Sequence, residues 1–273
     1  MKALRAIVFA IAIVLGMLVL PAPAASAQVC PPPPASSGSV APGSMQASGV
    51  NAGNVIDTVP QYLEWVVQDA DRVWTDWFKR NGMCEPEVGY ALVGTTMSSW
   101  TSNCKMPDGS TLYVTPDYPN AFYCPVDDTT GANGHVYAGT VILPVTTFYK
   151  MWFGDIFGKN SGVMGDFAAG AIVAHEFGHS VQDEMSQQLG WAAPKGKNKE
   201  LIADCYSGVW TWSINQRGQL EQGDLDEIAA ALNLMGDAEI TDNDHGTVQE
   251  RITAVNVGMQ NGDPMNCVSA YWR

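Results

Sequence analysis

The stretch His175-Glu176-Phe177-Gly178-His179 constrains this chain more than any other. It lies in an apolar run that predicts a helix over 165–189, and residues four apart on a helix share one face. His175 and His179 can therefore bind one metal ion, and this spacing favours zinc. Glu176 lies beside them, in position to accept a proton from a water that the metal activates. Two incidental histidines on a core helix are the alternative until a third ligand is found.

A third histidine is not available near this helix. No histidine lies between His179 and His245, and Met185 stands where one class of zinc protease carries its third ligand, so that class is excluded. Asp183 continues the same helix face, but it lies about 12 Å along the axis from His175. Because one ion cannot easily reach three successive turns of a straight helix, Asp183 is expected to be an exposed carboxylate or an outer partner of the site.

Two acidic residues on the next predicted helix, 198–217, supply a better partner. Glu200 and Asp204 are four apart on one face of an otherwise apolar helix. Burying carboxylates is costly unless they are paired or bind metal. Glu200 as the third ligand and Asp204 as the acceptor of an imidazole N–H would satisfy both. The alternative, a pair of solvated acids on the outer face, stays open at this point.

With these residues the chain resembles the bacterial putative neutral zinc metallopeptidase family. The resemblance rests on 175–182, 200–210, and 245–247 with Gln249 and Arg251, and also on 121–125 and 136–137 further upstream. It implies a thermolysin-like zincin fold. It also implies that His175, His179 and Glu200 bind zinc and that Glu176 is the base.

The beginning of the chain predicts export. Residues 1–27 have the layout of a secretory signal peptide, with Lys2 and Arg5 before an apolar run and a small-residue cleavage site ending at Ala27. Residues 28–54 are rich in Pro, Ser, Gly and Ala and predict a linker, which leaves 55–273 as the zinc metallopeptidase domain. We therefore expect a secreted protein.

The six cysteines all follow the predicted signal peptide, which predicts up to three disulfides. The sequence alone does not fix their pairing. Cys104 and Cys124 are close enough in sequence to link two strands of the expected sheet.

The formal net charge of −14 bears on partners. Phosphate backbones and anionic lipid surfaces repel such a chain, so nucleic acid is not an expected partner, and no later stretch is apolar enough for stable membrane insertion. A peptide or protein substrate is expected instead.

Between Gln219 and Glu250 there are nine acidic residues and no basic one. A calcium- or cell-wall-binding module with Asp242, Asn243 and Asp244 as calcium ligands is one interpretation, but a solvated acidic face is favoured.

The order of patterns predicts an α+β, zincin-like fold. We expect a small, mostly antiparallel sheet, then the helix of the zinc motif and a helical C-terminal part. Helical spacing of apolar residues predicts a first helix, and short β-like runs between turn residues predict the strands. The predicted helices are 60–80, 146–157, 165–189, 198–217, 224–234 and one that opens with a capping box at Thr247, and the predicted strands are 88–93, 111–114, 121–124, 135–138 and 141–143.

The predicted reaction is hydrolysis of peptide bonds by a zinc-activated water, with Glu176 as general base. His245 is the main candidate for a hydrogen-bond donor to the tetrahedral intermediate, and Tyr137 and Tyr206 are weaker ones. A merely neighbouring histidine is the alternative for His245. The strand at 136–137 could offer its edge to an extended peptide. The rival function is a catalytically inactive, zinc-binding secreted protein with a structural or binding role.

Overall fold

The computed structural model describes residues 55–95, 97–130, 134–156, 158–235 and 245–273. The predicted signal peptide and linker lie outside the described residues, as do Asp242, Asn243 and Asp244 of the calcium interpretation. Within the described part, no helix is both long enough and apolar enough to cross a membrane.

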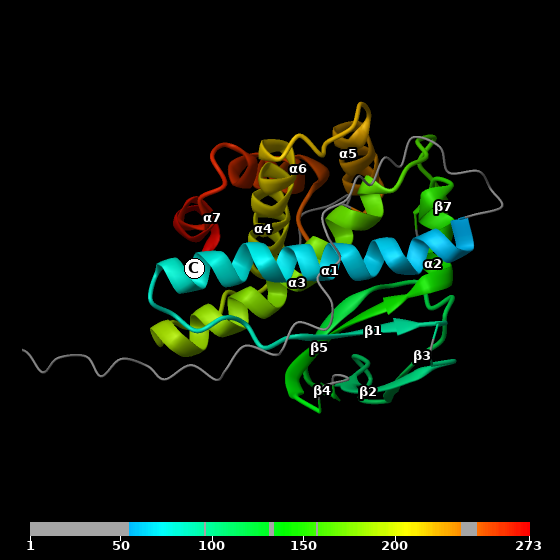
Figure 1. The fold of residues 1–273 in the computed structure, drawn as a ribbon, viewed down its shortest axis with the longest axis horizontal. Helices are drawn as coiled ribbons and strands as arrows, with labels where there is room; N and C mark the ends of the chain where they lie inside the picture. Colours follow the sequence, from blue (N-terminus) through cyan, green and yellow to red (C-terminus); the bar gives the residue numbers. More distant parts are fainter. Residues whose placement is uncertain (1–54, 96, 131–133, 157, 236–244) are drawn as a thin grey trace, which may run out of the picture.

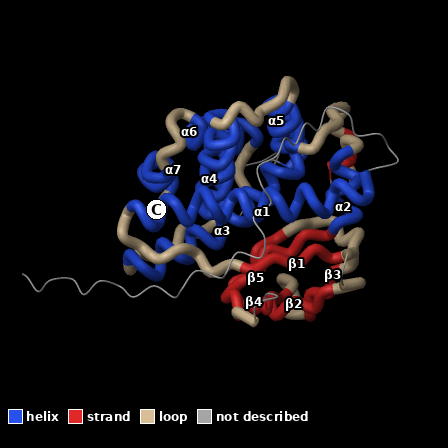
Figure 2. The backbone as a smooth tube through the Cα atoms, in the orientation of Figure 1, coloured by secondary structure: helices blue, strands red, loops and turns tan. Residues whose placement is uncertain are grey.

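The larger sheets lie together on one side of the fold and most of the helices on the other (Figure 2). A long helix, α1 (Val55–Arg80), precedes β1 (Gly89–Val93), β2 (Trp100–Lys105), β3 (Thr111–Val114), β4 (Phe122–Thr130) and β5 (Val136–Pro144). Next come α2 (Val145–Trp152) and a small hairpin of β6 (Asp155–Ile156) and β7 (Lys159–Asn160). The rest is helical: α3 (Phe167–Leu189), α4 (Lys197–Gln216), α5 (Asp224–Met235), α6 (Val248–Met259) and α7 (Pro264–Tyr271). The predicted α+β arrangement is confirmed.

The main sheet has the order β1-β5-β4, with β5 in its centre. β4 and β5 are antiparallel, and so are β2 and β3, but β1 lies parallel to β5. The predicted sheet is thus present, with one parallel pair in it. The disulfide Cys104–Cys124 ties β2 to β4, as the sequence spacing allowed. Asp127 of β4 adds to this link, because its buried carboxylate accepts hydrogen bonds from Trp100 and Ser102 of β2.

Some predicted element boundaries are wrong. The predicted strands 135–138 and 141–143 are one strand, β5, which continues through Gly139 at a φ of 84°. The predicted helix 146–157 is shorter, because Gly154, with a φ of 83°, turns the chain into the β6–β7 hairpin. Only glycine adopts such φ values without strain. Gly139 therefore lets β5 continue where the sequence suggested a break between two strands. Gly154 allows the turn that follows α2, where the sequence suggested a longer helix. The sequence patterns do not predict β2 or α7.

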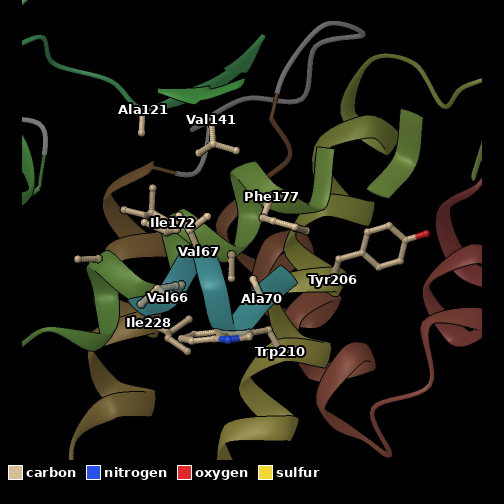
Figure 3. Close-up of a cluster of buried hydrophobic side chains, with 14 of the residues drawn as sticks. Val66, Val67, Ala70, Ala121, Val141, Ile172, Phe177, Tyr206, Trp210 and Ile228 are labelled. Atoms are coloured by element: carbon tan, nitrogen blue, oxygen red, sulfur yellow. The ribbon is translucent and has the colours of Figure 1, made fainter. Parts of the chain in front are cut away.

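Helix α3 lies at the centre of the fold. It packs against α1, α4 and α5, and also against β4 and β5 (Figure 1). Its first half is apolar all round and almost wholly buried, as expected for a helix surrounded by other elements. Side chains from α1, α4, α5 and the sheet meet around it, and Figure 3 shows part of this core. The motif 175–179 is therefore carried on a rigid, enclosed element.

Helices α4 and α6 cross with their backbones in close contact. A Cβ at Gly208 would lie 2.1 Å from a main-chain oxygen of α6, and a Cβ at Gly258 would lie 2.0 Å from a main-chain oxygen of α4. The disulfide Cys205–Cys267 fastens α4 to α7 next to this crossing. Because only glycine permits so close an approach, these two positions set where α6 lies relative to α4.

Replacing Gly208 by alanine should therefore destabilise the fold. The added methyl group forces α6 away from α4, and overpacking of this kind costs about 1–3 kcal/mol. Urea unfolding followed by circular dichroism measures the change. Asn256→Ala, on the exposed side of α6, is the matched control and should stay within about 0.5 kcal/mol of the unmodified protein. Equal stability of the two variants would contradict the close crossing.

Candidate metal centre

Three side chains from α3 and α4 converge at one point. His175, His179 and Glu200 each offer one ligand atom, and these atoms all lie within 4.8 Å of one another. The Nε2 atoms of His175 and His179 lie 3.2 and 3.6 Å from Oε2 of Glu200. The histidines are adjacent because they are one turn apart on α3, and Glu200 lies in the first turn of α4, which packs against α3. Two imidazole nitrogens and a carboxylate oxygen form a donor set that zinc takes.

A buried chain of polar groups fixes the ring of His175. Its Nδ1 lies 2.8 Å from Oδ1 of Asp204, so Nε2 faces Glu200. Asp204 in turn accepts two hydrogen bonds from the guanidinium of Arg251 in α6, at 2.7 and 2.8 Å. Asp204 and Arg251 are both only 2% exposed. The sequence-based expectation that Asp204 accepts from an imidazole N–H agrees with this geometry.

The charges around the two imidazoles favour a cation. Burial alone would lower the pKa of His175, but Asp204 and Glu200 outweigh it and raise this pKa to about 10. Burial would raise the pKa of Glu200, yet hydrogen bonds from His175 and His179 hold it well below its usual range. The carboxylates thus favour a positive charge at the imidazole nitrogens. A proton and a divalent cation compete for that place, so the donor set fits zinc in charge as well as in chemistry.

Glu176 lies beside the three ligands rather than among them. Its Oε2 accepts a hydrogen bond of 3.0 Å from the backbone N–H of Tyr123 in β4. Burial raises the pKa of Glu176, and the charges of His175 and His179 oppose the rise. A carboxylate with a raised pKa accepts a proton more readily. Position and charge therefore suit a general base.

A hollow of about 360 Å³ adjoins the ligands, within the size range of ligand sites. Its wall includes His175, Glu176, His179 and Glu200, the residues 120–123 at the beginning of β4, the end of α5 and His245. Residues 136–137, whose strand was expected to offer its edge to an extended peptide, do not line this hollow. Those residues belong to the central strand β5 and pair with 129–130 of β4. The strand that borders the hollow is β4, at the edge of the sheet.

Only one of the predicted hydrogen-bond donors borders the hollow. His245 is exposed and forms part of its wall. Tyr206 is fully buried, and its hydroxyl donates to the sulfur of Met185 at 3.1 Å, so Tyr206 is wrong as a donor to substrate. Tyr137 does not line the hollow and packs against the ring of His135.

Three residues without a role in the sequence-based prediction take part in the site. The guanidinium of Arg251 donates a hydrogen bond to the carboxylate of Asp204, and the backbone N–H of Tyr123 donates one to the carboxylate of Glu176. Gln182 is buried, its amide nitrogen lies 3.3 Å from Nδ1 of His179, and it donates to a main-chain carbonyl of α4. Arg251 could have been found from sequence, since a lone basic residue in a helix with apolar neighbours needs a buried acid. Backbone contacts such as that of Tyr123 leave no sequence signal.

Asp183 differs from the expectation of an exposed carboxylate. It is partly buried and hydrogen-bonded to the side chain of Tyr123. That ring passes over Gly139, where a Cβ would lie 2.4 Å from the Tyr123 hydroxyl. Asp183 thus supports the strand that holds Glu176 and is an outer partner of the site.

Comparisons with known proteins bear on this geometry. A sequence model of the family described as "Putative neutral zinc metallopeptidase" matches residues 7–270. "Uncharacterized protein YpfJ" of Escherichia coli (strain K12) is 34% identical over 167 residues, which cover 54% of this chain and 52% of that protein. "Uncharacterized protein Rv2575" of Mycobacterium tuberculosis (strain ATCC 25618 / H37Rv) is 31% identical over 172 residues, which cover 54% and 53%.

The chain thus spans about half the length of the curated relatives it matches. No solved structure matches it. The family match, by contrast, covers nearly all of the chain and includes every residue of the metal centre, so the resemblance drawn from the sequence motifs is confirmed. This chain belongs to the family described as putative neutral zinc metallopeptidase.

Proposed function

We propose that this chain is an exported zinc metalloendopeptidase with a zincin-like catalytic site. One observation carries the proposal: the donor atoms of His175, His179 and Glu200 meet within 4.8 Å beside a hollow that Glu176 also borders. A structural ion pair alone would account for the contact of the histidines with Glu200, but not for Glu176 beside them on the wall of the hollow. Family membership supports the same activity. The signal-like sequence of 1–27 supports export.

Each residue of the centre has a distinct task in this proposal. His175, His179 and Glu200 hold the zinc, and Asp204 keeps the ring of His175 turned toward it. When bound, zinc supplies Lewis acidity toward the peptide carbonyl and the attacking water. Glu176 accepts the proton of that water and then donates it to the leaving amine. The hydrogen bond from Tyr123 engages one oxygen of Glu176 and leaves the other for the water.

The peptide substrate lies along the edge of the sheet at the beginning of β4. Residues 120–122 border the hollow next to Tyr123, whose N–H donates to Glu176, and an extended peptide can pair with the backbone groups of an edge strand. His245, on the wall of the same hollow, donates a hydrogen bond to the carbonyl oxygen as negative charge develops on it.

The rival function is a secreted protein that binds zinc without catalysis. It needs the three ligands but gives no task to Glu176. In the structure Glu176 is held by a backbone hydrogen bond with its carboxylate next to the ligands, and its pKa is raised. This arrangement favours the enzyme.

Glu176→Gln separates the two functions. We expect it to lower peptide hydrolysis by about 10²–10⁴-fold, because the amide cannot accept the proton, and to leave the zinc content unchanged. Zinc is measured by mass spectrometry of the purified protein, and cleavage with a broad peptide library. Glu184→Gln, farther along α3 and outside the hollow, is the matched control and should keep wild-type turnover. Full activity of Glu176→Gln would exclude Glu176 as the base. If the unmodified protein contains zinc but cleaves no peptide, the non-catalytic zinc-binding function is favoured. Absence of zinc from the unmodified protein would overturn the proposal.

Asp204→Asn tests the support of the ligand His175. The variant removes the charge that stabilises the Nδ1 proton of His175, so the affinity for zinc should fall by about 10–100-fold. Competition with a coloured chelator measures this affinity, and circular dichroism checks that the variant is folded. Unchanged zinc affinity in a folded variant would show that Asp204 does not act through His175.

His245→Ala tests the proposed donor to the carbonyl oxygen. Loss of a donor that acts as charge develops should lower kcat by about 10²–10³-fold with little change in KM or in zinc content. His135→Ala is the matched control, because His135 lies beside Tyr137 and away from the hollow. If the two variants have the same kcat, His245 is only a neighbour of the site.

A further inference from the structure

A group of three acidic side chains meets at the start of α3, ahead of the turns that carry His175 and His179. Asp166 immediately precedes α3, and Asp224 and Glu227 lie in the first turn of α5. One oxygen of each carboxylate lies within 4.8 Å of one oxygen of each of the others. Asp166 is nine residues before His175, about 13 Å along the helix, so this group is separate from the metal centre.

These carboxylates do not form the solvated acidic face that the sequence favoured. Asp224 and Glu227, which belong to the acidic run 219–250, are only 5% and 9% exposed. Among the ion pairs between described residues, none joins Asp166, Asp224 or Glu227 to a basic side chain. Three carboxylates at such short range, two of them buried and Asp166 partly buried, repel one another unless a cation or protons intervene.

Hydrogen bonds from the backbone compensate only part of this charge. Oε2 of Glu227 accepts from the N–H of Phe167 at 2.8 Å, and Oδ2 of Asp224 accepts from the N–H of Glu221 at 2.8 Å. Burial, followed by the neighbouring carboxylates, still raises the pKa of Asp166 to about 7. Burial raises the pKa of Asp224 and of Glu227 too. The negative charge of the three carboxylates is therefore not fully compensated by these hydrogen bonds.

A buried hydroxyl without a partner points to the same place. Tyr62 of α1 is 2% exposed, and its hydroxyl has no hydrogen-bond partner in the part of the chain that the structure describes. The hydroxyl lies against the first turn of α3, since a Cβ at Gly170 would be 2.5 Å from it. The charges that act on it most are those of Asp166, Asp224 and Glu227, in that order. An unpartnered buried hydroxyl is rare and costly, and this one lies within the electrostatic influence of the three carboxylates, so it is available as a neutral oxygen ligand.

The backbone also makes room for this arrangement. The carboxylate of Glu227 occupies the space that a side chain at position 165 would fill, because a Cβ at Gly165 would lie 1.8 Å from Oε1 of Glu227. Glycine at this position thus lets Glu227 reach the start of α3.

We propose that Asp166, Asp224 and Glu227, with the hydroxyl of Tyr62, bind a calcium ion that fastens α5 to the start of α3. All the donors are oxygen, which selects a hard cation over zinc. Calcium accepts irregular sets of carboxylate and neutral oxygen donors, whereas magnesium demands near-octahedral geometry and keeps its waters. The end of α5, with Leu234 and Met235, forms part of the wall of the active-site hollow. The ion therefore stabilises a wall of that hollow without taking part in its chemistry.

Titration with calcium chloride tests the site directly. The zinc-loaded protein, freed of calcium on a chelating resin and checked for zinc content, is titrated in a calorimeter, and its Tm is measured with and without calcium. We expect one calcium per chain and a rise in Tm, and a smaller rise with the same concentration of magnesium chloride. No binding at millimolar calcium, or an equal response to magnesium, would overturn the proposal.

Variants test where the calcium ion binds and whether these residues stabilise the fold through the ion or without it. Glu227→Gln keeps the acceptor for the N–H of Phe167 but removes a charge. It should lose the calcium-dependent rise in Tm, yet be at least as stable as the unmodified protein without calcium, because repulsion is relieved. Tyr62→Phe should weaken calcium binding by about tenfold. Asp226→Asn, an exposed acid on the same helix, should leave calcium binding unchanged. Undiminished calcium binding in Glu227→Gln, or a Tm lowered equally with and without calcium, would contradict the site.

Discussion

The contact on which the candidate metal centre depends most is that of Asp204 with His175 and Arg251. Asp204 accepts from the ring of His175 on one side and from the guanidinium of Arg251 on the other, and all three groups are buried. The pair of Asp204 and Arg251 joins α4 to α6, and the close crossing of these helices at Gly208 and Gly258 brings the two side chains together. Such a buried pair is weak evidence for stability, but it fixes the direction of a ligand.

The ligand set can be predicted from the sequence because it obeys helical spacing. His175 and His179 share a face of one helix, and Glu200 and Asp204 share a face of the next, so the spacing pairs the residues on each helix. The packing of α3 against α4 then brings the two pairs together. The sequence predicts that Asp204 accepts from an imidazole N–H, and the structure shows that this imidazole is the ring of His175. The family resemblance points to the same residues and is confirmed by the match over 7–270.

Other parts of the site depend on contacts between distant segments and cannot be predicted from local patterns. Tyr123 holds Glu176 through a backbone N–H, which any residue other than proline would supply. The parallel pairing of β1 with β5 leaves no local pattern in the sequence, and neither does the position of residues 120–123 beside the hollow. The expectation of a solvated acidic face fails at Asp224 and Glu227, because sequence alone does not show that they turn inward toward α3.

Helix α3 takes part in both the candidate zinc site and the group of three carboxylates. Near its middle it carries the histidines of the candidate zinc site, and at its start it meets the carboxylates of the proposed calcium site. Anomalous diffraction at the zinc absorption edge, from crystals of the purified protein, shows whether His175, His179 and Glu200 bind zinc. We expect a single strong peak within bonding distance of these three residues. A peak at another place, or no peak, would exclude them as the zinc ligands.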